Sequence, residues 1–170
     1  DVVRQLREMA RASSASVKAV DEPPDVEVDA AAIELSLTNY ISNAIKYADP
    51  EKLNRTVEIH GRVERPDDAT GETLIVEVRD NGLGVPDDAK EKLFQRFFRA
   101  DDPTITGIEG TGLGLSIVRE TVEGIGGRAW VESGVEGGSV FAFAIPCRRG
   151  ETRTAETSEL SIANPEFGAR

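Results

Sequence analysis

The sequence predicts an α+β domain in which a mixed, mostly antiparallel sheet is covered on one face by helices. Segments with helical spacing of apolar residues and segments with alternating apolar residues follow one another loosely along the chain. Neighbouring strand segments lie close enough in sequence to pair antiparallel. The chain has 170 residues, 39% of them hydrophobic and 30% charged, which suits one globular domain with a single core.

The N-terminal half is predicted to contain two helices and four strands. The first helix covers residues 1–13, where apolar side chains recur at helical spacing. The second extends from Asp29, a typical N-cap residue, to about Ala48, where Asp49-Pro50 ends it. The strands are short runs of alternating or β-branched residues bounded by turn residues. They cover residues 16–20, 25–28, 56–64 and 73–80.

The C-terminal half is predicted to contain two further helices and two strands. The helices cover residues 87–98 and about 115–125, the second of which ends at Gly126-Gly127. The strands cover residues 128–133 and 138–145, and a glycine-rich turn joins them. Residues 147–170 are polar and aperiodic, so we expect a domain over residues 1–146 followed by a disordered tail.

Charge and composition exclude several classes of function. The 31 acidic and 20 basic residues give a formal net charge of −11, which argues against a nucleic-acid or anionic-membrane binder. Cys147 and His60 are the only cysteine and histidine, so we expect no internal disulfide, no His/Cys metal cluster and no Ser-His-Asp catalysis. No stretch approaches the roughly 18 apolar residues of a membrane span, so we expect no direct membrane insertion.

The predicted helix after Asp29 carries polar residues on one face. Asn39, Asn43 and Lys46 fall within about 60° of one another at 100° per residue, and Tyr47 lies at the edge of this stripe. A solvated surface is one interpretation. A ligand-binding face is the other, because an asparagine oxygen suits Mg²⁺, a lysine suits phosphate and a tyrosine suits a flat ring.

The strand over residues 73–80 ends in a carboxylate on its apolar face. Asp80 continues the two-residue period of Leu74, Val76 and Val78, so its carboxylate requires a hydrogen-bond donor. The next residues, 81–84, include two glycines that permit close approach of a ligand. An Asx-type turn that ends the strand explains this pattern. The alternative explanation is a ligand site, in which the Asp80 carboxylate accepts a hydrogen bond from the exocyclic amine of a ring.

A glycine-rich segment precedes the predicted helix at residue 115. Its residues are Gly110, Thr111, Gly112, Leu113, Gly114 and Leu115. Unpaired backbone N–H groups at a helix N-terminus favour a phosphate. The segment lacks the Gly-Lys-Ser/Thr of a P-loop, the strand and glycine spacing of the dinucleotide fingerprint, and the signatures of eukaryotic protein kinases.

Residues 93–99 contain three of the six phenylalanines of the chain. We expect these phenylalanines to pack into the core from a short helix. Arg96 and Arg99, which lie beside them, are candidate phosphate clamps.

Taken in order, these segments resemble the catalytic ATP-binding domain of sensor histidine kinases, within the gyrase, chaperone, histidine kinase and mismatch-repair ATPase superfamily. Residues 37–47 resemble its N box, 78–86 its G1 box, 93–99 its F box and 110–115 its G2 box. Residues 127–146 are similar to its closing hairpin. The resemblance covers residues 1–146 and implies a two-layer α/β sandwich of the Bergerat type.

The resemblance also implies roles in binding Mg²⁺ and adenine. Asn43 would coordinate Mg²⁺, with Asn39 supporting it, and Tyr47 would pack near the adenine. Asp80 would accept the adenine amine, which selects adenine over guanine. The other residues implied at the base pocket are Gly82, Gly84 and Ser139, the last supporting Asp80 through water.

Further residues are implied to hold the phosphates. Lys46 would contact phosphate oxygens, and Arg96 or Arg99 would position the γ-phosphate. Residues 86–110 would form a mobile ATP lid. The phosphate cradle would be the G2 box, with Gly110, Thr111, Gly112, Leu113, Gly114 and Leu115.

The resemblance implies transfer of the ATP γ-phosphoryl group to a histidine on a dimerisation domain absent from this chain. His60 lies on the polar face of a predicted strand and is expected to be a surface residue, not the acceptor. The implied partners are that histidine-containing domain and a response regulator, and the implied location is the cytoplasm. The alternatives are a serine-directed kinase of the anti-sigma-factor type and a degenerate interaction module without turnover.

Overall fold

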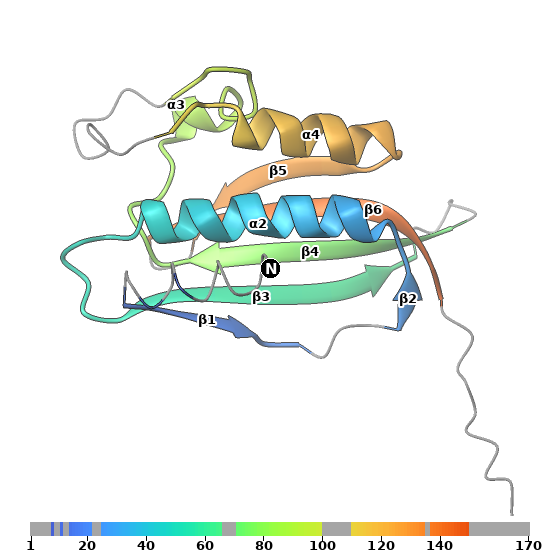
Figure 1. The fold of residues 1–170 in the computed structure, drawn as a ribbon, viewed down its shortest axis with the longest axis horizontal. Coiled ribbons are helices and arrows are strands. Elements are labelled where there is room, and N and C mark those ends of the chain that lie inside the picture. The colour runs from blue at the N-terminus through green and yellow to red at the C-terminus, as the bar shows by residue number, and fades with distance from the viewer. Residues whose placement is uncertain are drawn as a thin grey trace, which may run out of the picture.

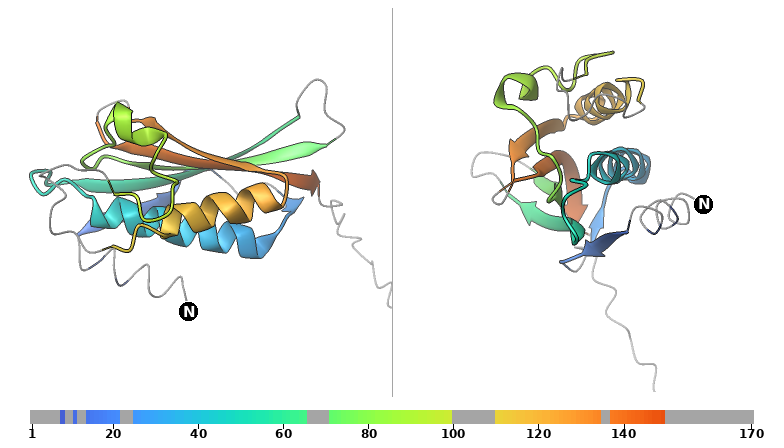
Figure 2. Two further views of the ribbon diagram at one scale, coloured as in Figure 1. Left: turned by 90° about the horizontal axis from the view of Figure 1, so that it is seen from above. Right: turned by 90° about the vertical axis from the view of Figure 1, so that its left-hand side faces the viewer.

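The computed structural model describes residues 8, 11, 14–21, 25–65, 71–99, 110–134 and 137–149. They form a six-stranded sheet with helices on one face (Figure 1). Figure 2 shows α2 (Ala30–Lys46) and α4 (Gly114–Gly124) side by side on that face. The predicted α+β architecture is therefore confirmed.

The sheet has the strand order β1-β3-β4-β6-β2, and β5 also pairs with β6. Among the described strands, the pair of β1 and β3 is parallel and the other pairs are antiparallel, so the sheet is mixed as expected. The strands are β1 (Ala15–Ala19), β2 (Val26–Glu27), β3 (Arg55–Glu64), β4 (Glu72–Asp80), β5 (Arg128–Ser133) and β6 (Ser139–Arg149).

Helix α2 begins as the sequence predicts, because the Asp29 side chain accepts a hydrogen bond from the Ala32 N–H at 3.0 Å. Its Tyr40 is fully buried against Phe141 and Phe143 of β6. The central pair β4–β6 contributes matched apolar residues to the same core, such as Val78 opposite Phe141. This register also places Asp80 opposite Ser139, at the end of both strands.

The predicted helix over residues 87–98 is wrong beyond its first turn. Helix α3 covers only Asp87–Lys90, and the chain then continues in turns. Phe97 has a φ of 63°, which no α-helix accommodates, and its N–H donates to the Gly112 carbonyl. A contact distant in sequence therefore replaces the helical hydrogen bond at this position.

The C-terminal elements differ from expectation at one boundary. Helix α4 ends as predicted, with Gly126 at a φ of 83°. Strand β6 continues through Arg149, beyond the predicted end at residue 145, because Arg148 and Arg149 pair with β2. The predicted tail over residues 147–170 begins too early, because residues 147–149 belong to β6. Its residues 150–170 and most of the predicted helix over residues 1–13 lie outside the described residues. Among the described helices, none is long and apolar enough to cross a membrane.

The turn between β5 and β6 brings two backbones together at Gly138. This residue has a φ of 75°, and a Cβ atom there would lie 2.0 Å from the Asp80 carbonyl oxygen and 2.7 Å from the Asn81 Cα. A side chain would therefore force the start of β6 away from the end of β4.

We expect Gly138→Ala to lower the free energy of unfolding by about 2 kcal/mol or more, from backbone strain and this collision. Gly124→Ala is the matched control, because a Cβ at Gly124 meets nothing within 4 Å and the helix prefers alanine. Urea unfolding of both variants measures the difference. Equal stability of the two variants would contradict the close approach at Gly138.

Candidate functional site

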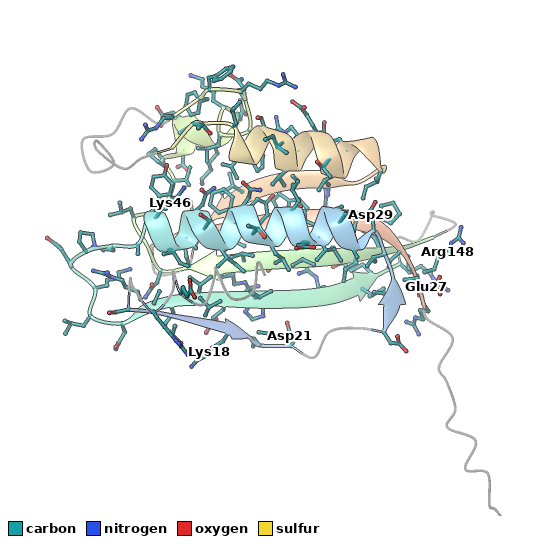
Figure 3. All side chains as sticks on the ribbon, in the orientation of Figure 1. Lys18, Asp21, Glu27, Asp29, Lys46 and Arg148 are labelled. Carbon is teal, nitrogen blue, oxygen red and sulfur yellow. The ribbon has the colours of Figure 1, made fainter. Side chains whose placement is uncertain are left out.

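A cavity of about 540 Å³ opens between the helices and one end of the sheet. Its wall combines the C-terminal part of α2, the end of β4, the turn after α3, the N-terminal end of α4 and the β5–β6 turn. Lys46 marks the end of α2 that borders it (Figure 3). Five segments distant in sequence thus meet at one site.

One end of the cavity holds the Asp80 carboxylate. The Gly82 N–H donates to its Oδ1 at 2.8 Å, and the hydroxyl and backbone N–H of Ser139 also donate to the carboxylate. Burial raises the pKa of Asp80, and these hydrogen bonds, together with the charge of Lys52, act against that increase. Ser139 therefore contacts Asp80 directly, so the expected bridging water is not needed.

Gly82 supports this end of the cavity without lining it. A Cβ at Gly82 would lie 2.4 Å from the Tyr47 carbonyl oxygen, and the Leu83 N–H donates to that same oxygen at 3.0 Å. The turn after β4 is thus packed directly on the C-terminal end of α2. Gly84, with a φ of 79°, does line the cavity.

The structure brings together the polar face predicted on α2. Asn39, Asn43, Lys46 and Tyr47 all line the cavity. Asn39 donates from Nδ2 to the Leu35 carbonyl at 2.9 Å. Within the described ranges, the Asn43 amide group makes no hydrogen bond and Lys46 makes no ion pair.

The glycine-rich segment lies across the cavity from α2. Its lining residues are Gly110, Thr111, Gly112, Gly114 and Leu115. Leu113 is the exception, since it is the N-cap residue of α4 and does not line the cavity. A Cβ at Gly114 would lie 2.4 Å from Asn39 Oδ1, so a side chain there would displace the Asn39 amide from its present position.

The turn after α3 separates the two candidate arginines. Arg99 lines the cavity, together with Phe98. Arg96 does not, and its guanidinium instead makes an ion pair with Glu120 of α4. The expectation that all three phenylalanines are in the core is wrong, because only Phe94 is buried there and Phe97 is 72% exposed.

Other lining residues were not identified from the sequence. The apolar ones are Leu83, Val85, Pro86, Leu93, Phe98 and Phe141. The others are Ser42, Ser133, Gly134, Gly137 and Gly138. The alternation of β6 could have identified Phe141, which shares a face with Ser139.

Within the described residues, neither His60 nor any cluster of His, Cys, Asp or Glu side chains provides a metal site at this wall. His60 is on β3, with its Nδ1 3.1 Å from the Asp21 carboxylate, and it does not line the cavity. Across the described part of the chain, no three His, Cys, Asp or Glu residues form a group that could hold a metal ion. An ion at this site would need ligands such as the Asn43 oxygen and a bound phosphate.

Known proteins match this chain over most of the described domain. Residues 28–149 match the family described as histidine kinase-, DNA gyrase B-, and HSP90-like ATPase. The sensor histidine kinase WalK of Bacillus subtilis (strain 168) is 40% identical over 122 residues, which are 71% of this chain and 19% of WalK. The chain spans between a tenth and a quarter of the length of the first curated relatives it matches.

Two solved structures show the same fold. The catalytic domain of the histidine kinase ThkA is 30% identical with a TM-score of 0.62, covering 85% of this chain and 91% of that one. Full-length ShkA, solved in complex with AMPPNP, is 24% identical with a TM-score of 0.65, covering 88% of this chain and 30% of ShkA.

The family match, the fold and the segments that form the cavity wall all agree. The chain belongs to the histidine kinase-, DNA gyrase B-, and HSP90-like ATPase family, in which it is the catalytic ATP-binding domain of a sensor histidine kinase.

Proposed function

We propose that the cavity binds ATP with its adenine at the Asp80 end. The observation that carries this proposal is a partly buried carboxylate held at one end of the cavity, beside the apolar residues Leu83, Val85 and Phe141 of its wall. Because Gly82 and Ser139 fix the carboxylate, it can accept the adenine amine without reorganising. Guanine presents a carbonyl oxygen in place of that amine, and two acceptors would then face each other.

The apolar residues of the wall would enclose the base. They include Leu83, Val85 and Phe141, and Tyr47 adds an aromatic ring at the end of α2. A flat ring buried against such side chains gains free energy from lost apolar surface. The complex of ShkA with AMPPNP supports a nucleotide here, since ShkA shares this fold.

The phosphates would lie between α2 and the start of α4. The backbone of Gly110, Gly112 and Gly114 borders this part of the cavity, and the N-terminal end of α4 carries a partial positive charge. Lys46 and Arg99 add full positive charges to the same wall. We assign Arg99, not Arg96, to the γ-phosphate, because only Arg99 lines the cavity.

The residues present fit a magnesium ion shared with the nucleotide. Asn43 offers an amide oxygen to the cavity, and Mg²⁺ bound by phosphates needs few protein ligands. When bound, Mg²⁺ would neutralise part of the phosphate charge. Asn39 would support the wall beside Asn43 rather than bind the ion, because its amide is hydrogen-bonded to the Leu35 carbonyl and lies next to Gly114.

The phosphoryl acceptor would be a histidine of a separate dimerisation domain. One imidazole nitrogen would attack the γ-phosphorus, the bond to the β,γ-bridging oxygen would break, and ADP would leave. The domain contributes position and charge, because phosphoryl transfer requires little else from the protein. A response regulator would then receive the group, and the reaction would take place in the cytoplasm.

Asp80→Asn should weaken ATP binding at least about tenfold, since a charge-assisted hydrogen bond contributes about 1.5–3 kcal/mol. Asp25→Asn, an exposed site far from the cavity, is the matched control. Calorimetric titration measures both affinities, and circular dichroism checks that both variants are folded. Unchanged affinity in folded Asp80→Asn protein would contradict the adenine assignment.

Asn43→Ala should reduce the gain in ATP affinity on adding Mg²⁺ by roughly tenfold or more, as weakened metal sites generally do. ATP affinity in EDTA should stay nearly unchanged, because the variant leaves the adenine contacts intact. Asn54→Ala, at an exposed position outside the cavity wall, provides the comparison. Equal magnesium dependence in the two variants would remove Asn43 from the metal site.

Incubation with γ-labelled ATP and a supplied histidine-containing dimerisation domain should label that domain. The label should be lost in acid and kept in alkali, as a phosphorus–nitrogen bond requires, and the catalytic domain itself should stay unlabelled. An acid-stable label on serine would instead support a kinase of the anti-sigma-factor type. Nucleotide binding without labelling of any supplied domain would support an interaction module.

A further inference from the structure

Two neighbouring residues of α4 hold the turn that follows α3. Glu120 binds Arg96 through both carboxylate oxygens, at 2.8 Å to Nε and 2.7 Å to Nη2. Arg119 places its guanidinium over the Phe94 ring, 4.6 Å from the centroid. Figure 1 shows this turn beside the N-terminal end of α4. Helix α4 therefore contacts the turn at a buried residue, Phe94, and at an exposed residue, Arg96.

The backbone of the turn requires such support. Phe97 directly follows Arg96 and has a left-handed φ of 63°, a conformation that is costly for a residue with a large side chain. Its N–H donates to the Gly112 carbonyl at 2.9 Å. A Cβ at Gly112 would lie 2.9 Å from the Phe97 carbonyl carbon, so this pair of backbones is in close contact.

The chain reaches the cavity within three residues after the ion pair of Arg96 with Glu120. Arg96 lies outside the cavity wall, whereas Phe98 and Arg99 are part of it. A bidentate arginine–carboxylate pair fixes orientation better than a lysine pair does, because both groups are planar. Hydrogen bonding to Arg96 lowers the pKa of the Glu120 carboxyl, so the pair stays ionised at neutral pH.

We propose that Glu120, paired with Arg96 and assisted by Arg119, is a positioning residue that holds Arg99 in the cavity wall for its contact with the γ-phosphate. This inference rests on the proposed function and extends it to residues that touch no nucleotide. It separates the two arginines by role: Arg99 contacts the phosphate, and Arg96 anchors the turn.

The test compares the affinities for ATP and ADP, both with Mg²⁺, by calorimetry. Glu120→Gln should lower ATP affinity about two- to fivefold, the range expected from one exposed ion pair, and leave ADP affinity unchanged. Glu123→Gln is the control on the same helix, because its contact with Arg119 is longer, at 3.8 Å. The charge-reversed pair Arg96→Glu with Glu120→Arg should restore ATP affinity.

A double-mutant cycle separates this role from a general loss of structure. In an Arg99→Gln background, Glu120→Gln should have no further effect on ATP affinity, because Glu120 acts through Arg99. Additive losses, equal losses for ATP and ADP, no loss in Glu120→Gln, or no rescue by charge reversal would each overturn the positioning role. Absence of ATP binding in the unmodified chain would instead overturn the proposed function itself.

Discussion

Two close backbone contacts at the end of β4 determine where the cavity lies. Gly82 lies against the carbonyl of Tyr47, the C-cap residue of α2, and Gly138 lies against the carbonyl of Asp80. A side chain at the first position would separate helix from sheet, and one at the second would separate β6 from β4. Because both contacts are tight, the Asp80 carboxylate is held between Gly82 and Ser139 with its hydrogen bonds already made. The end of the cavity where we propose that the base binds is thus a direct result of strand and helix packing.

We propose that the opposite end of the cavity holds the phosphates of the nucleotide, although the whole chain has a net charge of −11. At this end of the cavity, positive charge comes from Lys46, Arg99 and the N-terminal end of α4. Arg96 does not add to this set, because Glu120 neutralises it outside the cavity. The local field at the phosphates therefore depends on which cations face the cavity and not on the overall charge.

The sequence predicts the elements whose patterns are local. Helix α2, with its Asp29 cap, and the apolar face of β4 up to Asp80 follow from periodicity and capping alone. The turn after α3 could not be predicted, because the positive φ of Phe97 depends on Gly112, which is distant in sequence. For the same reason, the spacing of the two arginines could not show which one faces the cavity.

Calorimetric titration of the unmodified chain with ATP and GTP, each with and without Mg²⁺, tests the central claim most directly. The arrangement of the Asp80 carboxylate and the Asn43 amide predicts binding that prefers adenine and is strengthened by Mg²⁺. Equal affinity for ATP and GTP would contradict the role of Asp80 in recognising the base. Absence of binding by any nucleotide would contradict the whole account of the cavity as an ATP site.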